Sequence, residues 1–373
     1  MISNAFGLIY TGESTPQLKE LTLSRAVAAV PFGGRYRCID FILSNMVNSG
    51  ITNVGLLTQK NYHSLMDHLG AGKEWDLHRK REGLFILPPF MTKSNVGQYR
   101  GSVDALHAAI GYIRRSAEQY VILSGSHTIF NMRFTDMLDQ HIRTGADLTI
   151  LYNGRPTLDP EAQSGDLRLT LDADGRVTDM ELNAYRPKTD WQGCDVFIFD
   201  KGLLEHLVEE ACARGEYDFL RDVVLKKYTT LKTFGYRYDG YVARLDSLLT
   251  YFKHSMELLA QEVAVDLFDK DRIFTKVKDE FSAKYGSRSS VCHSILADGC
   301  MVDGSVENSV VFRGVKIMEG AKVKDSIIMQ GVTIGENAVL DHVILDKGVT
   351  IRPSRMLVGY DNFPIIIKKN QVV

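Results

Sequence analysis

The last eighty residues of the chain repeat at a fixed step of 17 residues. Gly314, Gly331 and Gly348 share this step, and three apolar columns keep it as well. Those columns are Val306, Val323 and Leu340; Val315, Val332 and Val349; and Ile317, Ile334 and Ile351. A unit of such a repeat buries its apolar side only against its neighbours, so the units must stack as coils. Apolar residues about every six positions, with Gly, Asn or Asp at corners, predict a left-handed parallel β-helix of hexapeptide coils. Three columns with one spacing disfavour the alternative, a set of β-hairpins.

The first two thirds of the chain have a different rhythm. Short apolar runs predict buried strands that end at Gly or polar turns, at 5–12, 52–59, 120–125 and 146–152. Amphipathic stretches at 102–116 and 134–145 predict helices between them. This alternation predicts a largely parallel sheet with helices on both faces, and ligands bind at the carboxyl ends of such strands. We expect an α/β domain over 1–252, a helix and connector over 253–290, and the β-helix over 291–373.

Composition narrows the classes of protein. With 44 basic and 46 acidic residues the formal charge is −2, which argues against both a nucleic-acid binder and a membrane-surface protein. The sequence has no apolar run of 18 residues, and its start lacks a basic leader, so we expect a cytoplasmic protein. Five cysteines lie scattered without a CxxC pair, which predicts neither a disulfide framework nor a zinc site.

A resemblance to a known family runs through most of the chain. It starts at "AVPFGGRYRCIDFILSNMVNSGITNVGLLTQ" (29–59) and continues through "HLGAGKEWDLHR", "YRGSVDAL", "ILSGSH" and "DADGRVTDMEL" into the repeat. In these segments the chain resembles bacterial ADP-glucose pyrophosphorylases (glucose-1-phosphate adenylyltransferases). The resemblance implies a nucleotidyltransferase domain followed by a β-helix, and a role in making ADP-glucose, the glucosyl donor for glycogen.

The phosphate-binding loop departs from the family pattern. Family members have a loop resembling AGGxGxRLxxLTxxRAKP, in which glycines let backbone amides approach the phosphates. Here only Gly12 remains of the glycines, and one residue is inserted. Gln17 stands in place of the loop arginine, while Val27 and Ala28 replace the lysine and the proline of RAKP. Such a loop does not hold a triphosphate in the same way.

The metal-binding positions depart as well. The resemblance implies a Mg²⁺ held by the Asp of SGDH and the Asp of GYWxDVGT, and Ser126 and Arg244 occupy these positions. Opposite unit charges 4 Å apart attract by about 4 kcal/mol at an effective dielectric near 20, and an arginine turns this attraction into repulsion. Asp246 could still act if the alignment is shifted, since strand alternation puts it on the face of Arg244. Arg244 could instead hold a phosphate without reacting it, and His127 is expected to face away from Ser126.

The sugar-phosphate side has lost its pattern too. Asn183 or Ala184 stands at the family's lysine, Gly193 and Asp195 replace the Ser and Gly of SMGIY, and Leu220 replaces the Gly of DFGKD. Some nucleotide-side positions are kept, namely Gly12, Gln59, Gly101, Ser102 and Asp104. This joint loss resembles a sister group of non-catalytic subunits. It implies a regulatory chain that holds no cofactor of its own and acts on an active subunit that holds Mg²⁺. It also implies a tetramer, either of this chain alone or of both subunits. The alternative is a weakly active adenylyltransferase.

Several further residues carry weaker hypotheses. Arg35 and Arg37 follow the FGG turn, where family members carry basic residues near an anionic effector site; a solvated turn is the other interpretation. His63 and His68 are five apart and so share no helix face, which favours surface or packing roles over a metal site. Trp75 fits a family PWD-like segment or a core position. His293 and His342 fit β-helix corners better than the histidine of a hexapeptide acyltransferase.

Overall fold

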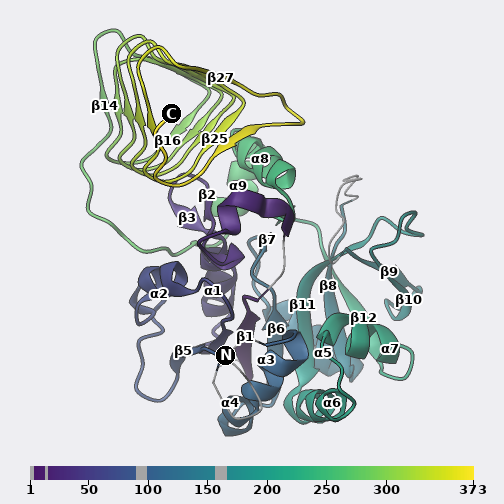
Figure 1. The fold of residues 1–373 in the computed structure, drawn as a ribbon. Helices are drawn as coiled ribbons and strands as arrows, with labels where there is room; N and C mark the ends of the chain where they lie inside the picture. Colours follow the sequence, from purple (N-terminus) through teal and green to yellow (C-terminus); the bar gives the residue numbers. More distant parts are fainter. Residues whose placement is uncertain (1–3, 13–15, 90–98, 156–165) are drawn as a thin grey trace.

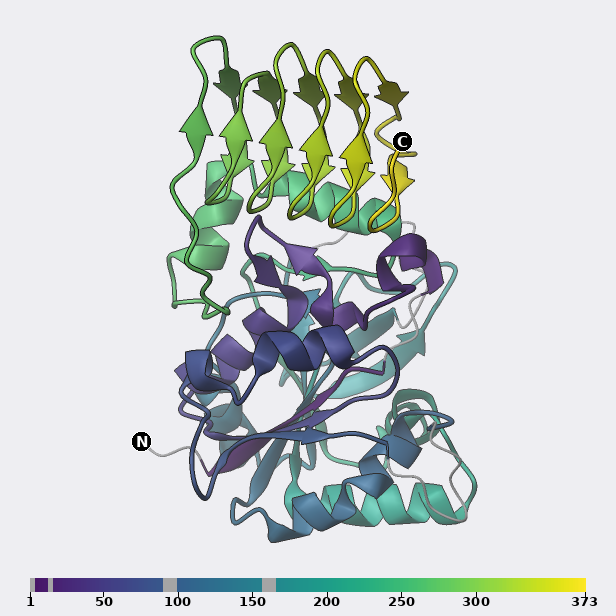
Figure 2. The same cartoon turned by 60° about the vertical axis from the view of Figure 1, so that its left-hand side comes forward.

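The computed structural model describes residues 4–12, 16–89, 99–155 and 166–373. An α/β part lies beneath a three-sided stack of coils, seen end-on in Figure 1 and from the side in Figure 2. Within the described residues, no helix is long and apolar enough to cross a membrane. The predicted α/β domain and β-helix are therefore both present, in the predicted order.

A nine-stranded sheet forms the centre of the α/β part. Strands β5, β4, β1 and β6 are parallel neighbours in that order, as the alternating pattern predicts. The other half of the sheet is mixed: β11 is antiparallel to β6 and β8, β9 is antiparallel to β10, and β12 is parallel to β8. The nine strands are β1 (Ala5–Tyr10), β4 (Asn53–Leu57), β5 (Gly83–Leu87), β6 (Tyr120–Ser124), β8 (Leu148–Asn153), β9 (Leu167–Leu171), β10 (Val177–Leu182), β11 (Gln192–Asp200) and β12 (Thr233–Tyr238).

Helices cover both faces of the sheet because its strands are apolar on both sides. In β1, Phe6 and Leu8 pack on the face of α3, α4 and α6, while Ala5 and Ile9 pack on the face of α1, α2 and α5. Gly145, with φ 56°, ends α5. The helices are α1 (Cys38–Asn48), α2 (His63–Leu69), α3 (Ser102–Ala108), α4 (Ile110–Arg115), α5 (Thr135–Thr144), α6 (Lys201–Ala213), α7 (Leu225–Lys227), α8 (Leu248–Glu257) and α9 (Gln261–Phe268). Two further sheets have two short strands each: β2 (Pro31–Phe32) with β3 (Tyr36–Arg37), and β7 (Thr128–Ile129) with β13 (Ala243–Arg244).

The C-terminal repeat forms a left-handed parallel β-helix with three five-stranded sheets. Ile317 pairs with Ile334, and Ile334 pairs with Ile351, which confirms the predicted register of the repeat. Corners are made by residues with left-handed backbone, among them His293 and His342 (φ 44° and 52°). The strands are β14 (Lys284–Tyr285), β15 (Ser290–Cys292), β16 (Ile295–Leu296), β17 (Met301–Val302), β18 (Ser305–Glu307), β19 (Val310–Val311), β20 (Lys316–Ile317), β21 (Lys322–Lys324), β22 (Ile327–Ile328), β23 (Thr333–Ile334), β24 (Val339–Asp341), β25 (Val343–Leu345), β26 (Thr350–Ile351), β27 (Met356–Val358) and β28 (Ile365–Ile367).

One side of the β-helix packs on the α/β part. Its sheet β16-β19-β22-β25-β28 contributes apolar side chains to a cluster that also contains residues of α8, α9 and α1. The members from the β-helix are Val310, Phe312, Ile327, Met329 and Ile344. The boundaries at 252/253 and 290/291 stay predictions: α8 crosses the first of them, and β14 precedes the second.

A buried ion pair joins the two parts beside this cluster. Nη2 of Arg25 donates to both carboxylate oxygens of Asp346 at 2.7 Å. The two residues are 3% and 1% exposed. A charge in such surroundings is tolerated only while its partner is present. The pair therefore fixes how the β-helix sits on the α/β part.

Arg25→Met or Asp346→Asn alone is expected to lower the free energy of unfolding by about 3–5 kcal/mol, because each leaves one buried charge or polar group without its partner. The double variant R25M/D346L should lose less than either single variant. Urea unfolding followed by circular dichroism measures both effects. Arg79→Met removes the exposed pair with Asp76 and serves as control, with a loss below about 1 kcal/mol. Equal losses for the buried and the exposed pair would contradict this account.

Candidate functional site

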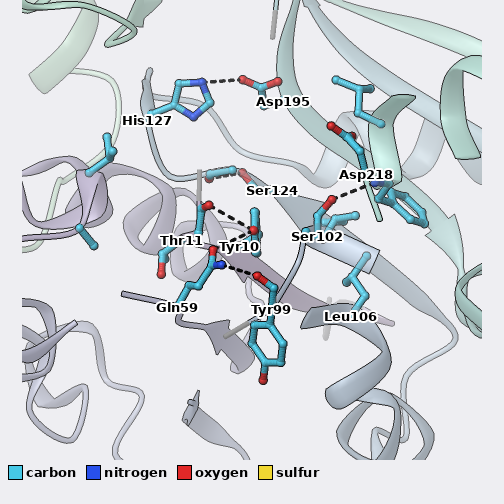
Figure 3. A pocket seen from close by; sticks show the side chains of 18 of the residues that line it. Tyr10, Thr11, Gln59, Tyr99, Ser102, Leu106, Ser124, His127, Asp195 and Asp218 are labelled. Atoms are coloured by element: carbon cyan, nitrogen blue, oxygen red, sulfur yellow. Dashed lines mark hydrogen bonds and ion pairs between the residues drawn. The ribbon is translucent and has the colours of Figure 1, made fainter. Parts of the chain in front are cut away.

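A cavity of about 880 Å³ opens at the carboxyl ends of the parallel strands (Figure 3). Its wall includes Thr11 and Gly12 after β1, Gln59 after β4, and Gly125 and His127 after β6. This is where the α/β pattern predicts a ligand, because the loops that follow parallel strands converge at one edge of the sheet.

The kept nucleotide-side positions surround one part of this cavity. The wall contains Gly12, Gln59, Gly101 and Ser102. Nε2 of Gln59 donates to the carbonyl oxygen of Tyr99 at 2.8 Å, and its Oε1 accepts from the hydroxyl of Tyr10 at 3.3 Å. The backbone N–H of Phe219 donates to Oγ of Ser102 at 2.8 Å. These side chains therefore also hold the wall together, as Figure 3 shows.

Other predicted positions lie differently. Asp104 stays outside the wall and forms an ion pair with Arg100 at 2.8 Å. Gln17 is half-buried and also lies outside the wall. Val27 is in the wall but is buried, and it packs in the cluster between the two parts of the chain. Residues 13–15 of the altered loop lie outside the described residues.

Four titratable or charged side chains meet at the inner end of the cavity. Nε of Arg244 donates to both oxygens of Asp246, at 3.0 and 2.8 Å, and its Nη1 lies 3.0 Å from Oδ2 of Asp195. Nε2 of His127 lies 3.2 Å from Oδ2 of Asp195 and 3.5 Å from Oδ1 of Asp246. All four are buried. We call these four residues the inner cluster; Figure 3 shows its contact between His127 and Asp195.

His127, not Ser126, faces the cavity. Ser126 is fully buried and outside the wall, whereas His127 lines it. The two side chains face different sides, as the sequence indicated, but His127 rather than Ser126 lies at the cavity. The reason is that β6 ends at Ser124, and the alternation of a strand does not extend beyond its end. The pairing of β7 with β13 then places Arg244 opposite Thr128, next to His127.

A bulge in β11 supplies the carboxylate of Asp195. The pairing of β11 with β8 shifts register between Gly193 and Phe197, and Asp195 there has φ 55°. Bulges redirect side chains, and Asp is one of the residue types that tolerate left-handed backbone. The resemblance places a glycine at this position, so a permissive conformation was a signal that the sequence offered. The ion pair with Arg244 had no local signal.

The charge of Arg244 is fixed by its neighbours. Burial works against the charged guanidinium, but the carboxylates of Asp195 and Asp246 outweigh it and raise the pKa of Arg244 above its usual value. One cation therefore faces two carboxylates. Nε of Arg244 donates to the carboxylate of Asp246, and its Nη1 forms an ion pair with the carboxylate of Asp195.

The predicted sugar-phosphate positions divide between the wall and its surroundings. Asn183 and Leu220 line the cavity together with Asp195. Ala184 and Gly193 lie outside the wall. Of the two candidates for the position of the family's lysine, the structure therefore brings Asn183 to the cavity, and an amide supplies no positive charge there.

A second, smaller cavity of about 30 Å³ lies where the turn around Arg35 meets the β-helix. Six arginine and lysine side chains line it together with Asp67 and His68, namely Arg35, Arg37, Lys276, Lys278, Arg313 and Lys347. The sequence pattern indicated only the first two, because the other four lie far along the chain, in the connector and the β-helix. We call this cavity the basic pocket.

Positive charge is crowded in the basic pocket. Burial and the guanidinium groups of Arg37 and Arg25 lower the pKa of Lys347 to about 7. Burial also lowers the pKa of Arg37, and burial together with Arg35 lowers that of Arg313. Each of these shifts means that the folded protein disfavours the positive charge, so an anion bound here would be stabilising.

The remaining histidines and Trp75 have structural surroundings. His63 is exposed, while His68 is buried with Nε2 2.6 Å from Oδ1 of Asp40. Trp75 is fully buried in the core. Among the described residues, one group has ligand atoms near enough to one another for a metal, and it lies at a β-helix corner: Asp325, Asp341 and His342. There Nδ1 of His342 lies 2.5 Å from Oδ1 of Asp341.

Lys347→Met is expected to stabilise the protein most below pH 7 and least near pH 10. The folded pKa is about 7, whereas the lysine of the unfolded chain titrates near 10.5, so between these values the unfolded chain binds more protons. The stability of the wild type therefore rises with pH relative to the variant, by up to about 5 kcal/mol. Urea unfolding from pH 6.5 to 9.5 measures the difference, and exposed Lys253→Met is the control. Parallel curves for wild type and Lys347→Met would refute this.

Comparisons with known proteins follow the two-part organisation. A nucleotidyl transferase family profile matches residues 6–238, and a GlmU-like C-terminal hexapeptide profile matches residues 279–363. The chain is 37% identical over 306 residues to the glycogen biosynthesis protein GlgD of Bacillus subtilis, covering 82% of this chain and 78% of that protein. It is 38% identical to GlgD of Geobacillus stearothermophilus (86% and 83% covered). It is 36% identical to glucose-1-phosphate adenylyltransferase of Thermotoga maritima (86% and 76% covered).

Proposed function

This chain belongs to the glucose-1-phosphate adenylyltransferase family of nucleotidyl transferases, and on that premise we propose that it is a regulatory, catalytically degenerate subunit in glycogen biosynthesis. Its role is to modulate an active subunit that makes ADP-glucose from ATP and glucose 1-phosphate. The two relatives named glycogen biosynthesis protein GlgD support the pathway. The proposed location is the cytoplasm.

The inner cluster carries the proposal. Nucleotidyl transfer depends on a divalent ion, held by carboxylates, that positions the phosphate and neutralises the charge developing on the leaving group. Here the carboxylates of Asp195 and Asp246 hold the guanidinium of Arg244 instead. A fixed cation at this place repels a divalent ion, and without the ion most of the electrostatic stabilisation of the transition state is lost. Mg²⁺ then belongs to the active subunit.

The basic pocket supports a site for one phosphate group of an anionic sugar-phosphate effector, since its volume of about 30 Å³ is too small for the sugar. Two of its cations, Arg35 and Arg37, come from the α/β part, and two, Arg313 and Lys347, come from the β-helix. Phosphate is a ligand that such clusters of Arg and Lys bind through charge-assisted hydrogen bonds. An anion held by both parts would link the position of the β-helix to the α/β part, which is the coupling that regulation needs.

The last coil of the β-helix supports assembly with a partner subunit into a homo- or hetero-tetramer. Met356, Tyr360 and Phe363 expose about 70% of their surface there. Strands β27 and β28 are the outer strands of their sheets at the same end, whereas the C-terminal residues pair with β26. Exposed apolar side chains beside unpaired strand edges are typical of contact surfaces.

Purified chain is expected to form no ADP-glucose from ATP and glucose 1-phosphate with Mg²⁺ at ordinary enzyme rates, because the inner cluster holds no place for the ion. Product formation followed by chromatography measures this. Turnover by the chain alone, abolished by Asp246→Ala, would contradict the proposal and support an active enzyme instead.

Mixing the chain with an active glucose-1-phosphate adenylyltransferase subunit is expected to change the rate of that subunit and to produce a mixed assembly on size-exclusion chromatography. Y360S/F363S should weaken both effects, since it removes two exposed aromatic contacts. Tyr185→Ser, which changes a residue 95% exposed in the α/β part, is the matched control. An unchanged rate in the mixed assembly would refute the regulatory role.

Inorganic phosphate or a sugar bisphosphate is expected to raise the thermal unfolding temperature of the wild type, because bound anion relieves the crowded positive charge of the basic pocket. Arg313→Ala should remove most of that rise, and Lys253→Met should leave it unchanged. Differential scanning fluorimetry at constant ionic strength measures the shift. An equal rise in the wild type and in Arg313→Ala would contradict an effector site in the basic pocket.

A further inference from the structure

We propose that the β-helix corner formed by Asp325, Asp341 and His342 is a binding site for one divalent transition-metal ion, of which Zn²⁺ is the type. The corner lies between β24 and β25, near the yellow end of the stack in Figure 1. Among the described residues, these three bring their ligand atoms near enough for one ion, all within 4.8 Å of one another. The site goes beyond the proposed function and does not depend on it.

The coil repeat brings the three ligands together. Asp325 and His342 are one step of 17 residues apart, and both have left-handed backbone, with φ 44° and 52°. They therefore occupy the same corner of neighbouring coils, and Asp341 stands directly before this corner at the end of β24. Asn308 occupies the corner of the preceding coil, and its Nδ2 donates to Oδ1 of Asp325. This hydrogen bond holds the carboxylate of Asp325 at the corner.

The next coil is longer at this corner and folds back over it. A single residue separates β24 from β25, whereas residues 359–364 separate β27 from β28. Gly359 lets this loop lie close, because a Cβ there would be 2.4 Å from the carbonyl oxygen of His342. Within the loop, Oδ1 of Asp361 lies 2.6 Å from Nε2 of His342. A carboxylate from the last coil thus reaches the same imidazole.

Negative charge is concentrated at the corner. Nδ1 of His342 lies 2.5 Å from Oδ1 of Asp341, and its Nε2 faces Asp361, so one imidazole stands between two carboxylates. Asp325 adds a third carboxylate, and the exposed ammonium of Lys324 lies 3.8 Å from its Oδ2. Burial works against the charged imidazole, but the hydrogen bonds with Asp361 and Asp341 outweigh it and raise the pKa of His342. The corner therefore favours a bound cation.

The ligand types select the class of ion. Zn²⁺ takes imidazole nitrogen and carboxylate oxygen at about 2.0–2.2 Å, which places neighbouring ligand atoms about 3–4 Å apart. Ca²⁺ and Mg²⁺ prefer sites made of oxygen alone. The side chains of Asp325, His342 and Asp341 are 17%, 18% and 32% exposed, so an ion can enter from solvent. Asp361 or water then completes the coordination.

A bound ion supports the free end of the β-helix. The last coil has a neighbour on one side only, so contacts across its corner matter more than those within the stack. The ion ties the coil of Asp325 to that of His342, and through Asp361 it fixes the loop between β27 and β28. The same loop presents the exposed rings of Tyr360 and Phe363.

The test is isothermal titration of ZnCl₂ into the full chain after treatment with EDTA and desalting. The wild type is expected to bind one ion per chain saturably, and Zn²⁺ should raise its thermal unfolding temperature. H342N keeps a residue type that tolerates left-handed backbone but removes the imidazole, so binding should weaken about tenfold or more. D325N should weaken binding similarly, since it removes one charged ligand.

H293N is the matched control. His293 occupies the same corner of an earlier coil, with φ 44°, but its Nδ1 lies 2.9 Å from the amide oxygen of Asn308 rather than beside a carboxylate. H293N should therefore bind Zn²⁺ as the wild type does. CaCl₂ is expected to give no saturable binding that depends on His342.

Each outcome bears on the proposal. No saturable binding by the wild type, or undiminished binding by H342N or D325N, overturns the site. Loss of binding in H293N also overturns it, because exposed side chains such as Cys292 then hold the ion. Equal affinity for Ca²⁺ overturns the transition-metal class. If circular dichroism shows that H342N does not fold, D325N decides: a tenfold loss supports the site, and wild-type affinity overturns it.

Discussion

The packing of one β-helix sheet on the α/β part is the contact on which both cavities depend. Arg25 lines the large cavity and holds Asp346 of the β-helix through two hydrogen bonds at 2.7 Å. The next residue, Lys347, lines the basic pocket. A single junction therefore contributes to the wall of both cavities. Any force that moves the β-helix acts on both at once, which is the physical requirement for communication between two sites.

The inner cluster shows how a fold keeps its framework while its chemistry changes. The parallel strands, the cavity at their carboxyl ends and the carboxylates around it are all present. What differs is the source of positive charge: a side chain provides it, where nucleotidyl transfer uses an exchangeable ion. A tethered cation costs less entropy to hold than a free one, and it cannot be supplied or withdrawn. In the proposed degenerate subunit, the cluster is thus a structural element of the cavity floor.

Much of the fold could be predicted because its signals are periodic. The step of 17 residues fixed which residues stack, and Ile317, Ile334 and Ile351 are aligned as expected. The position of the large cavity followed from the strand ends. Contacts between distant segments had no such signal: the cations of the basic pocket converge from the α/β part, the connector and the β-helix.

The site shows the limits of local rules most clearly. Strand alternation correctly placed Asp246 on the side of Arg244, since the two side chains are hydrogen-bonded. It did not reveal that the carboxylate of Asp246 accepts from the guanidinium of Arg244. The same rule did not reveal that His127 rather than Ser126 lies at the cavity, because the strand before them ends at Ser124. Asp195 depends on a bulge, and the family's glycine at this position was its one signal in the sequence. Local patterns therefore locate a site, whereas its charge balance depends on tertiary contacts.

The number of coils also sets how far along the β-helix axis each residue lies. Neighbouring coils lie about 4.8 Å apart along the β-helix axis, the spacing of paired strands. Deleting or inserting one coil before Asp346 would shift that carboxylate by a whole spacing from Arg25, and Lys347 would leave the basic pocket with it. A coil added after the last one would disturb neither. The number of coils between the connector and Asp346 is thus held constant by the junction, while the free end of the stack can vary in length.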